Sequence, residues 1–121
     1  MSADRLVLFR PVGPVELALI EASDRRSFPP RLPERPFFHP VLNLEYAVRI
    51  ASTWNVDASG AGFVTRVEID AAFASRYPVR TVGAAGVHRE IWVPAEELAA
   101  LNAHIIGRIE VVDSFRRDPE P

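Results

Sequence analysis

Four side chains, Arg10, Phe38, His39 and Glu90, are of types that can act together on a positively charged intermediate. A carboxylate stabilises a cation that develops in a transition state, an aromatic face holds a planar ring, and a guanidinium pairs with phosphate oxygens. Arg10 ends an early apolar run, Phe38 and His39 lie among prolines, and Glu90 begins a late apolar run. The fold must therefore bring three distant segments together.

Other catalytic templates lack their essential residues. The chain has no cysteine, and all 14 basic residues are arginine, which excludes thiolate, Schiff-base and P-loop lysine chemistry. The three histidines show no metal-binding spacing, so no metal is expected. No nucleophile elbow and no glycine-rich phosphate fingerprint occurs. Among the chemistries that need few groups is cleavage of the nicotinamide–ribose bond of NAD, which passes through an oxocarbenium-like cation.

Composition predicts one domain over residues 1–121. The hydrophobic fraction is 48%, which is enough for one core in a chain of this length. A net charge of −2 and a pI of about 5.9 argue against nucleic acid as a partner. No signal peptide and no apolar run of membrane-spanning length is present, so a cytoplasmic location is expected.

Periodicity predicts an α+β domain with a mixed or mostly antiparallel sheet and two to four short helices; a small barrel is the alternative. The residues expected in the core include Leu8, Leu19, Ala51, Trp54 and Ile91. The expected elements are a strand over 5–10, a helix over 14–23, a proline-rich loop over 24–40, a helix over 44–54 capped by Asn43, a strand over 62–69, a short helix over 71–76 capped by Asp70, a strand over 78–82, a glycine loop over 83–86, a strand over 90–93, a helix over 94–101, a strand over 105–112 and a frayed tail over 116–121.

The sequence resembles a group of short bacterial proteins labelled "ADP-ribosylation/crystallin J1". The resemblance lies in residues 8–13 (LFRPVG), 28–33 (FPPRLP), 40–43 (PVLN), 45–47 (EYA), 62–66 (GFVTR) and 90–98 (EIWVPAEEL). The larger ADP-ribosylglycohydrolases behind that label use a di-metal carboxylate site. The sequence has no such aspartate cluster, so their activity is not implied.

The order of segments is also distantly similar to compact ADP-ribosyltransferase-like domains. That resemblance implies that Arg10, Phe38, His39 and Tyr46 contact NAD and that Glu90 is catalytic. His88, rather than a second glutamate, stands two residues before Glu90, so transfer to arginine is not implied. The acceptor and the oligomeric state stay open, and a protein acceptor or partner is compatible with the pattern.

Two functions follow from these patterns. The first is an ADP-ribosyltransferase or NAD glycohydrolase that binds NAD as its substrate. The second is a non-enzymatic domain that binds a partner on the same scaffold. They differ in one geometric expectation, because the first requires Arg10, His39 and Glu90 to line a single cleft.

Overall fold

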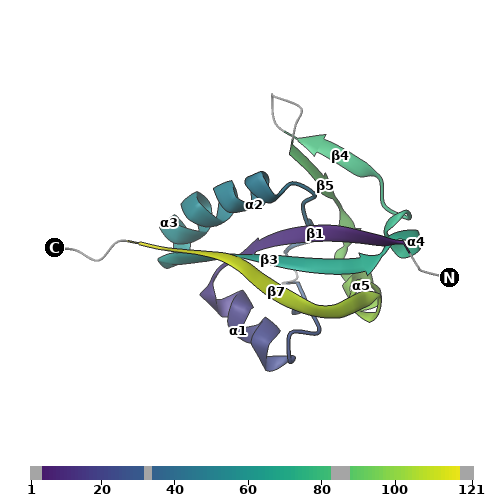
Figure 1. Cartoon of the computed structure of the whole chain (residues 1–121), viewed down its shortest axis with the longest axis horizontal. Helices are drawn as coiled ribbons and strands as arrows, with labels where there is room; N and C mark the ends of the chain where they lie inside the picture. The colour runs from purple at the N-terminus through teal and green to yellow at the C-terminus, as the bar shows by residue number, and fades with distance from the viewer. Residues whose placement is uncertain (1–3, 32–33, 83–87, 118–121) are drawn as a thin grey trace.

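The computed structural model describes residues 4–31, 34–82 and 88–117 as one α+β domain (Figure 1). Among the described residues, no helix is both long and apolar enough to span a membrane. The elements in chain order are β1 (Arg5–Val12), α1 (Pro14–Ala22), β2 (Phe37–Phe38), α2 (Leu44–Ile50), a π-helical turn (Ala51–Asn55), α3 (Val56–Ser59), β3 (Ala61–Asp70), α4 (Ala71–Ala74), β4 (Val79–Val82), β5 (His88–Ile91), β6 (Val93–Pro94), a 3₁₀ turn (Ala95–Glu97), α5 (Leu98–Ala103) and β7 (Ile105–Arg116).

The central sheet has the order β1-β3-β7, and every strand pair that the structure describes is antiparallel. Val41 extends this sheet at the β1 edge, because it forms bridges to Phe9 of β1 and to Glu90 of β5. The β4–β5 hairpin is thereby attached next to β1, and Figure 1 shows it projecting away from the central strands. The expected mostly antiparallel α+β architecture is confirmed.

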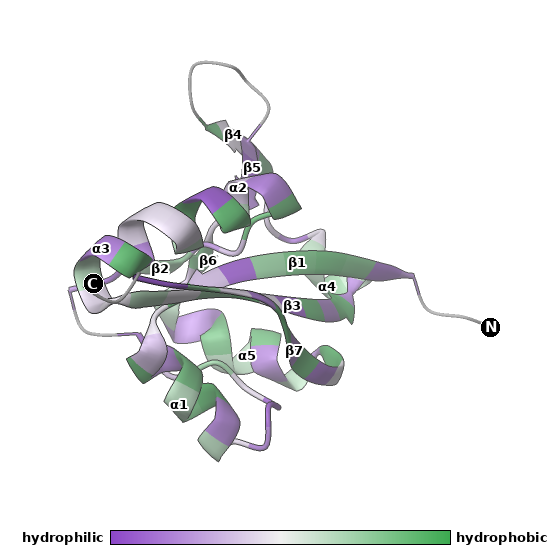
Figure 2. Ribbon diagram, turned by 60° about the vertical axis from the view of Figure 1, so that its left-hand side comes forward, coloured by the Kyte–Doolittle hydropathy of each residue, from purple (hydrophilic) through white to green (hydrophobic). Residues whose placement is uncertain are grey.

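Alternation along β1 places two sets of side chains on opposite faces of the sheet. Leu8 and Val12 belong to the larger core cluster, to which α1, α4 and α5 contribute. Phe9 packs instead against the smaller cluster of Val41, Ala47, Ala51 and Val64 on the α2 side. Figure 2 shows α1 and α5 on one side of the sheet and α2 and α3 on the other. Arg10 falls on the larger-core face, two residues from each of its buried neighbours Leu8 and Val12.

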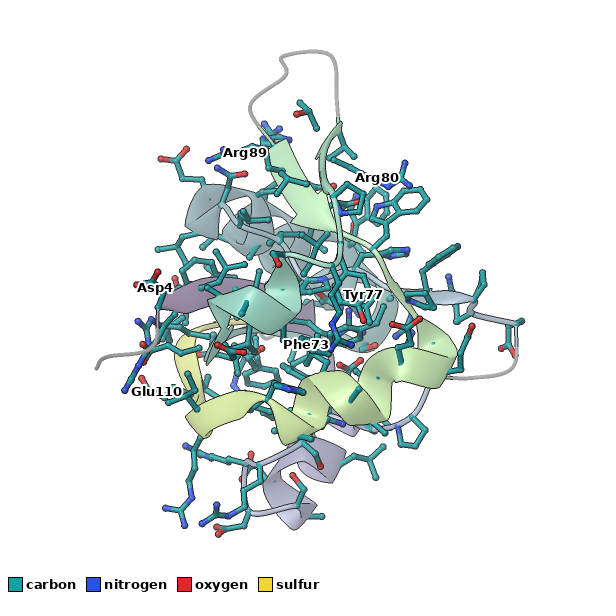
Figure 3. The ribbon with its side chains drawn as sticks, turned by 90° about the vertical axis from the view of Figure 1, so that its right-hand side faces the viewer. Asp4, Phe73, Tyr77, Arg80, Arg89 and Glu110 are labelled. Carbon is teal, nitrogen blue, oxygen red and sulfur yellow. The ribbon has the colours of Figure 1, made fainter. Side chains whose placement is uncertain are left out.

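Helix α4 closes one end of the larger core. Asp70 caps it as expected, since its side chain accepts from the Phe73 N–H at 3.2 Å. Phe73 stacks on His104 at the end of α5, with ring centroids 4.2 Å apart. The Tyr77 hydroxyl donates to Glu97 Oε1 at 2.5 Å, and burial together with this bond raises the pKa of Tyr77 to about 12. Phe73 and Tyr77 lie between α4 and α5 in Figure 3.

The prediction that Leu19 and Trp54 lie in the core is wrong. In α1 the buried residue is Ile20, with Leu17 packed beside it, so Leu19 is turned outward. In the second helix the π-helical turn adds one residue to a turn of the backbone. That insertion shifts the phase by about 100°, and Trp54 becomes 76% exposed. Asn55 moves onto the inward side in its place.

Several local expectations also differ from the structure. The expected strand over 90–93 divides at Trp92 into β5 and β6. Asn43 precedes α2 but makes no capping bond, because its Oδ1 accepts from the Arg89 N–H at 2.7 Å. The segment 24–40 contains the short strand β2. Arg116 belongs to β7, and the Arg117 N–H donates to the Gly60 carbonyl at 2.9 Å, so this part of the expected tail is ordered. The expected glycine loop over 83–86 and residues 118–121 lie outside the described residues.

Candidate functional site

The proline-rich segment runs antiparallel to the strand that carries Glu90. Backbone N–H groups of Leu42, Ile91 and Ala95 join the two segments, and the last two donate to the carbonyls of Pro40 (3.1 Å) and Pro36 (2.8 Å). Proline has no N–H to donate but accepts at its carbonyl, so both prolines fit this edge pairing. This pairing fixes the aromatic residues 37–39 beside Glu90 and Trp92.

Trp92 is the centre of an aromatic cluster at this position. Its ring centroid lies 5.4 Å from Phe37 and 5.3 Å from His39. Arg80 of β4 places its guanidinium carbon 4.5 Å from the centre of the indole, and Figure 3 shows Arg80 beside this group of rings. The indole Nε1–H donates to Glu90 Oε1 at 2.6 Å, which fixes the direction of the carboxylate.

His39 connects Glu90 to a group of arginines. Burial lowers the pKa of the half-buried imidazole below its ordinary value of 6.5. The charge of Glu90 acts against this shift, and those of Arg31, Arg10 and Arg35 add to it. His39 therefore lies within electrostatic reach of the carboxylate and of all three guanidinium groups. The expectation that Arg10, His39 and Glu90 line a single cleft stays a prediction, since none of the three is among the residues that line the cavity described below.

The pKa of His39 is expected to respond to charge removal in opposite directions. Glu90→Gln should lower it further, and Arg35→Gln should raise it, because each variant removes one of the two opposing charges. An NMR titration of the imidazole protons measures both shifts. The control is Arg26→Gln, which removes an exposed arginine that pairs with Asp24. If the pKa of His39 is unchanged in both variants, these charges do not act on the imidazole.

The lowered pKa also has a consequence for stability. Between the folded-state pKa and 6.5 the unfolded chain binds more protons at His39, so this contribution to the free energy of unfolding rises with pH. It is fully present above pH 6.5 and is lost as the pH falls through that window. Urea unfolding of the parent and of His39→Gln at several pH values isolates it.

Arg10 is held in place by two neighbours. Its Nε and Nη2 atoms donate to the two carboxylate oxygens of Glu16, at 2.6 and 2.9 Å. Its guanidinium carbon lies 4.4 Å from the centre of the Phe38 ring. The Arg10 side chain is only 11% exposed. Phe38 is buried against Phe28, with ring centroids 5.0 Å apart, so in this structure its ring packs against both Phe28 and Arg10.

Tyr46 lies on α2. Its ring stacks on His88, with centroids 4.3 Å apart and planes 3° from parallel. Burial raises the pKa of the Tyr46 phenol, and the nearby charge of Glu90 adds to the shift. The predicted residues His39 and Tyr46 thus contact different rings. His39 packs against Trp92, and Tyr46 stacks on His88.

A cavity of about 520 Å³ is lined in part by Arg31 and Arg35, two of the arginines whose charges act on the pKa of His39. We call it the arginine cavity, because Arg31 and Arg35 contribute to its lining. The lining residues are Gly13, Val15, Glu16, Leu19, Pro29, Pro30, Arg31, Arg35, Asn55 and Ser59. Sequence reasoning assigned no role to Arg31, Arg35 or Asn55. The proline-rich loop was an available signal for the arginines, but Asn55 was hidden by the change of helical phase.

Within residues 4–31, 34–82 and 88–117, no group of three or more His, Cys, Asp or Glu side chains is placed to hold a metal ion. We found no family model, no curated protein and no solved structure that the chain matches. Functional inference therefore depends on the geometry of the chain itself. That geometry combines a fixed carboxylate, an aromatic cluster, an imidazole of lowered pKa and a cationic cavity.

Proposed function

We propose that the chain binds NAD and cleaves its nicotinamide–ribose bond on an ADP-ribosyltransferase-like scaffold. The observation that carries this proposal is the Glu90 carboxylate, which accepts from the Trp92 indole N–H at 2.6 Å, with Phe37 and His39 packed against the same indole. The charges that act on the pKa of His39 are those of Glu90 and of Arg10, Arg31 and Arg35, so a carboxylate for the reacting ribose and cations for the diphosphate are both near this imidazole. NAD needs both, because its diphosphate is anionic while its ribose becomes cationic in the transition state.

Glu90 is the proposed catalytic residue. As the bond between the ribose C1′ and the nicotinamide nitrogen breaks, its electron pair goes to the ring nitrogen, and nicotinamide leaves as a neutral molecule. The positive charge that remains on the ribose is stabilised by the carboxylate. Water, or a hydroxyl or amine of an acceptor, then attacks C1′ and loses a proton. The Trp92 N–H bond orients the carboxylate throughout.

The aromatic cluster supports binding of the nicotinamide end. Trp92 and His39 offer planar rings next to Glu90, and both are half-buried rather than enclosed. The lowered pKa of His39 favours the neutral imidazole, which adds no repulsion toward the positively charged nicotinamide of NAD. Arg31 and Arg35, which line the arginine cavity, attract the diphosphate.

Isothermal calorimetry with NAD is the experiment that tests binding. We expect Arg10→Ala to weaken NAD binding by about 10- to 100-fold, because charge-assisted bonds contribute about 1.5–3 kcal/mol each and the variant also leaves Glu16 unpaired. Arg5→Ala, at the exposed opposite end of β1, is the matched control and should bind as the parent does. If the two variants bind NAD equally well, Arg10 does not contact NAD. Binding without nicotinamide release would favour the non-enzymatic binding domain.

A further inference from the structure

The arginine cavity contains polar atoms whose hydrogen-bonding capacity is not used. Arg31 Nε, a donor, and Asn55 Oδ1, an acceptor, are both buried and have no hydrogen-bond partner among the described residues. Buried polar atoms are normally paired, and leaving one unpaired costs about 1–3 kcal/mol. Both residues line the same cavity, so a ligand bound there can supply the missing acceptor and donor once these side chains turn toward it.

The charges around the cavity favour an anion. Glu16 lines it, but both of its oxygens are taken up by the bidentate pair with Arg10. Arg31 and Arg35 form no ion pair with any residue that the structure describes. Burial lowers the pKa of Arg31, the charges of Arg10 and Arg35 lower it further, and the charge of Glu16 acts against this shift. An anion placed between these groups would relieve that repulsion.

The backbone adds donors to the same wall. Helix α1, nine residues long, begins with Pro14 after Gly13 and has no side-chain cap. Its first turn leaves N–H groups without an intrahelical partner, and Val15 and Glu16 of that turn line the cavity. A Cβ on Gly13 would lie 3.5 Å from Ser59 Oγ and 3.9 Å from Asn55 Nδ2. The helix start, Asn55 and Ser59 therefore converge at one point.

We propose that the arginine cavity binds the phosphorylated ribose of a nucleotide. The phosphate oxygens accept from Arg31, Arg35 and the start of α1, and a ribose hydroxyl donates to Asn55 Oδ1. Val15, Leu19, Pro29 and Pro30 form an apolar wall for the attached base. A volume of about 520 Å³ is within the range of small-molecule sites and far exceeds what a lone phosphate occupies. Only the identification of that nucleotide as NAD rests on the proposed function.

Three probes separate the parts of this ligand: AMP, adenosine and inorganic phosphate, each titrated into ¹⁵N-labelled protein. We expect AMP to bind more tightly than either of the others, with the largest amide shifts at Gly13, Glu16 and Ser59. Arg35→Gln should weaken AMP binding by about 10-fold, as the loss of one charge-assisted contact predicts, and Arg31→Gln by at least as much. Arg35 is exposed, so its replacement leaves the fold intact.

Asn55→Ala tests the ribose contact separately. It should reduce the preference for AMP over inorganic phosphate and leave phosphate affinity unchanged, because only the hydroxyl loses its acceptor. Arg26→Gln, which removes an exposed arginine outside the cavity, is the matched control. Equal AMP affinity in Arg35→Gln and in the control, or no binding of AMP to the parent, overturns the proposal. If Glu90→Gln still binds AMP, the arginine cavity is independent of NAD cleavage. The proposal for the cavity then holds even if the chain does not cleave NAD.

Discussion

Nicotinamide release from NAD is expected to fall by about 10²–10³-fold in Glu90→Gln, because a single preorganised group that stabilises developing charge contributes this much to a rate. NAD affinity should change little, since the carboxylate acts on a charge that grows only as the bond breaks. Initial rates of nicotinamide formation at saturating NAD, together with calorimetric affinities, measure the two effects.

Glutamine is the informative replacement at this position because it keeps the local hydrogen bond. Its side-chain carbonyl can still accept from Trp92 Nε1, so the shape of the cluster is retained while the charge is removed. The control is Glu68→Gln on β3, which removes a carboxylate that pairs with Arg5 and Arg66. It should cleave NAD as fast as the parent does. A Glu90→Gln protein as active as the parent would end the transferase hypothesis.

Gly62→Ala is expected to destabilise the fold by about 3 kcal/mol or more, at the upper end of the usual cost of overpacking. A Cβ at this position would lie 2.0 Å from the Ala51 carbonyl oxygen and 2.7 Å from its carbon. These are backbone atoms of the π-helical turn, so the strand and the helix would have to separate. Urea unfolding followed by circular dichroism measures the loss.

Gly13→Ala provides the matched comparison for stability. The same added methyl group would meet its nearest neighbour, Ser59 Oγ, at 3.5 Å, which is ordinary contact. Gly13 has an extended conformation that alanine also adopts, so we expect a loss of about 1 kcal/mol or less from the weaker helix cap. Equal losses in the two variants would contradict the close approach of β3 to the π-helical turn.

The sequence predicted most strands because their signal is local. Along β3, Phe63, Thr65, Val67 and Ile69 alternate with partly exposed residues in its second half, and all four are buried on the larger-core face. The last strand was expected to end at residue 112, yet β7 continues to Arg116. Its final residues are mostly exposed and polar, so pairing with the start of β3 extends the strand without any apolar pattern to reveal it.

Periodicity failed where the backbone changed its period. A 3.6-residue repeat carried the expected apolar face of the second helix from Ala47 and Ala51 to Trp54. The π-helical turn over Ala51–Asn55 interrupts that repeat, and it turns Trp54 to solvent and Asn55 toward the arginine cavity. No sequence pattern marked the turn beforehand. Gly62 was visible in the sequence, but its role depends on a contact between segments.

The joint role of Glu90, His39 and Arg10 stays a prediction, because none of the three is among the residues that line the arginine cavity. The pairing of Arg10 with Glu16 was not foreseen, because it depends on how α1 folds back against β1. Arg31 and Arg35 were read only as parts of a proline-rich loop. Their positions are set by the tertiary placement of that loop against α1 and α3, which no local rule supplies.

The most direct test of the central claim is to incubate the purified chain with NAD and to quantify free nicotinamide by liquid chromatography. We predict that nicotinamide accumulates in proportion to the amount of protein and to time. Nicotinamide at the level of a buffer control, over a range of protein concentrations and with NAD well above any measured dissociation constant, would contradict NAD cleavage by this chain.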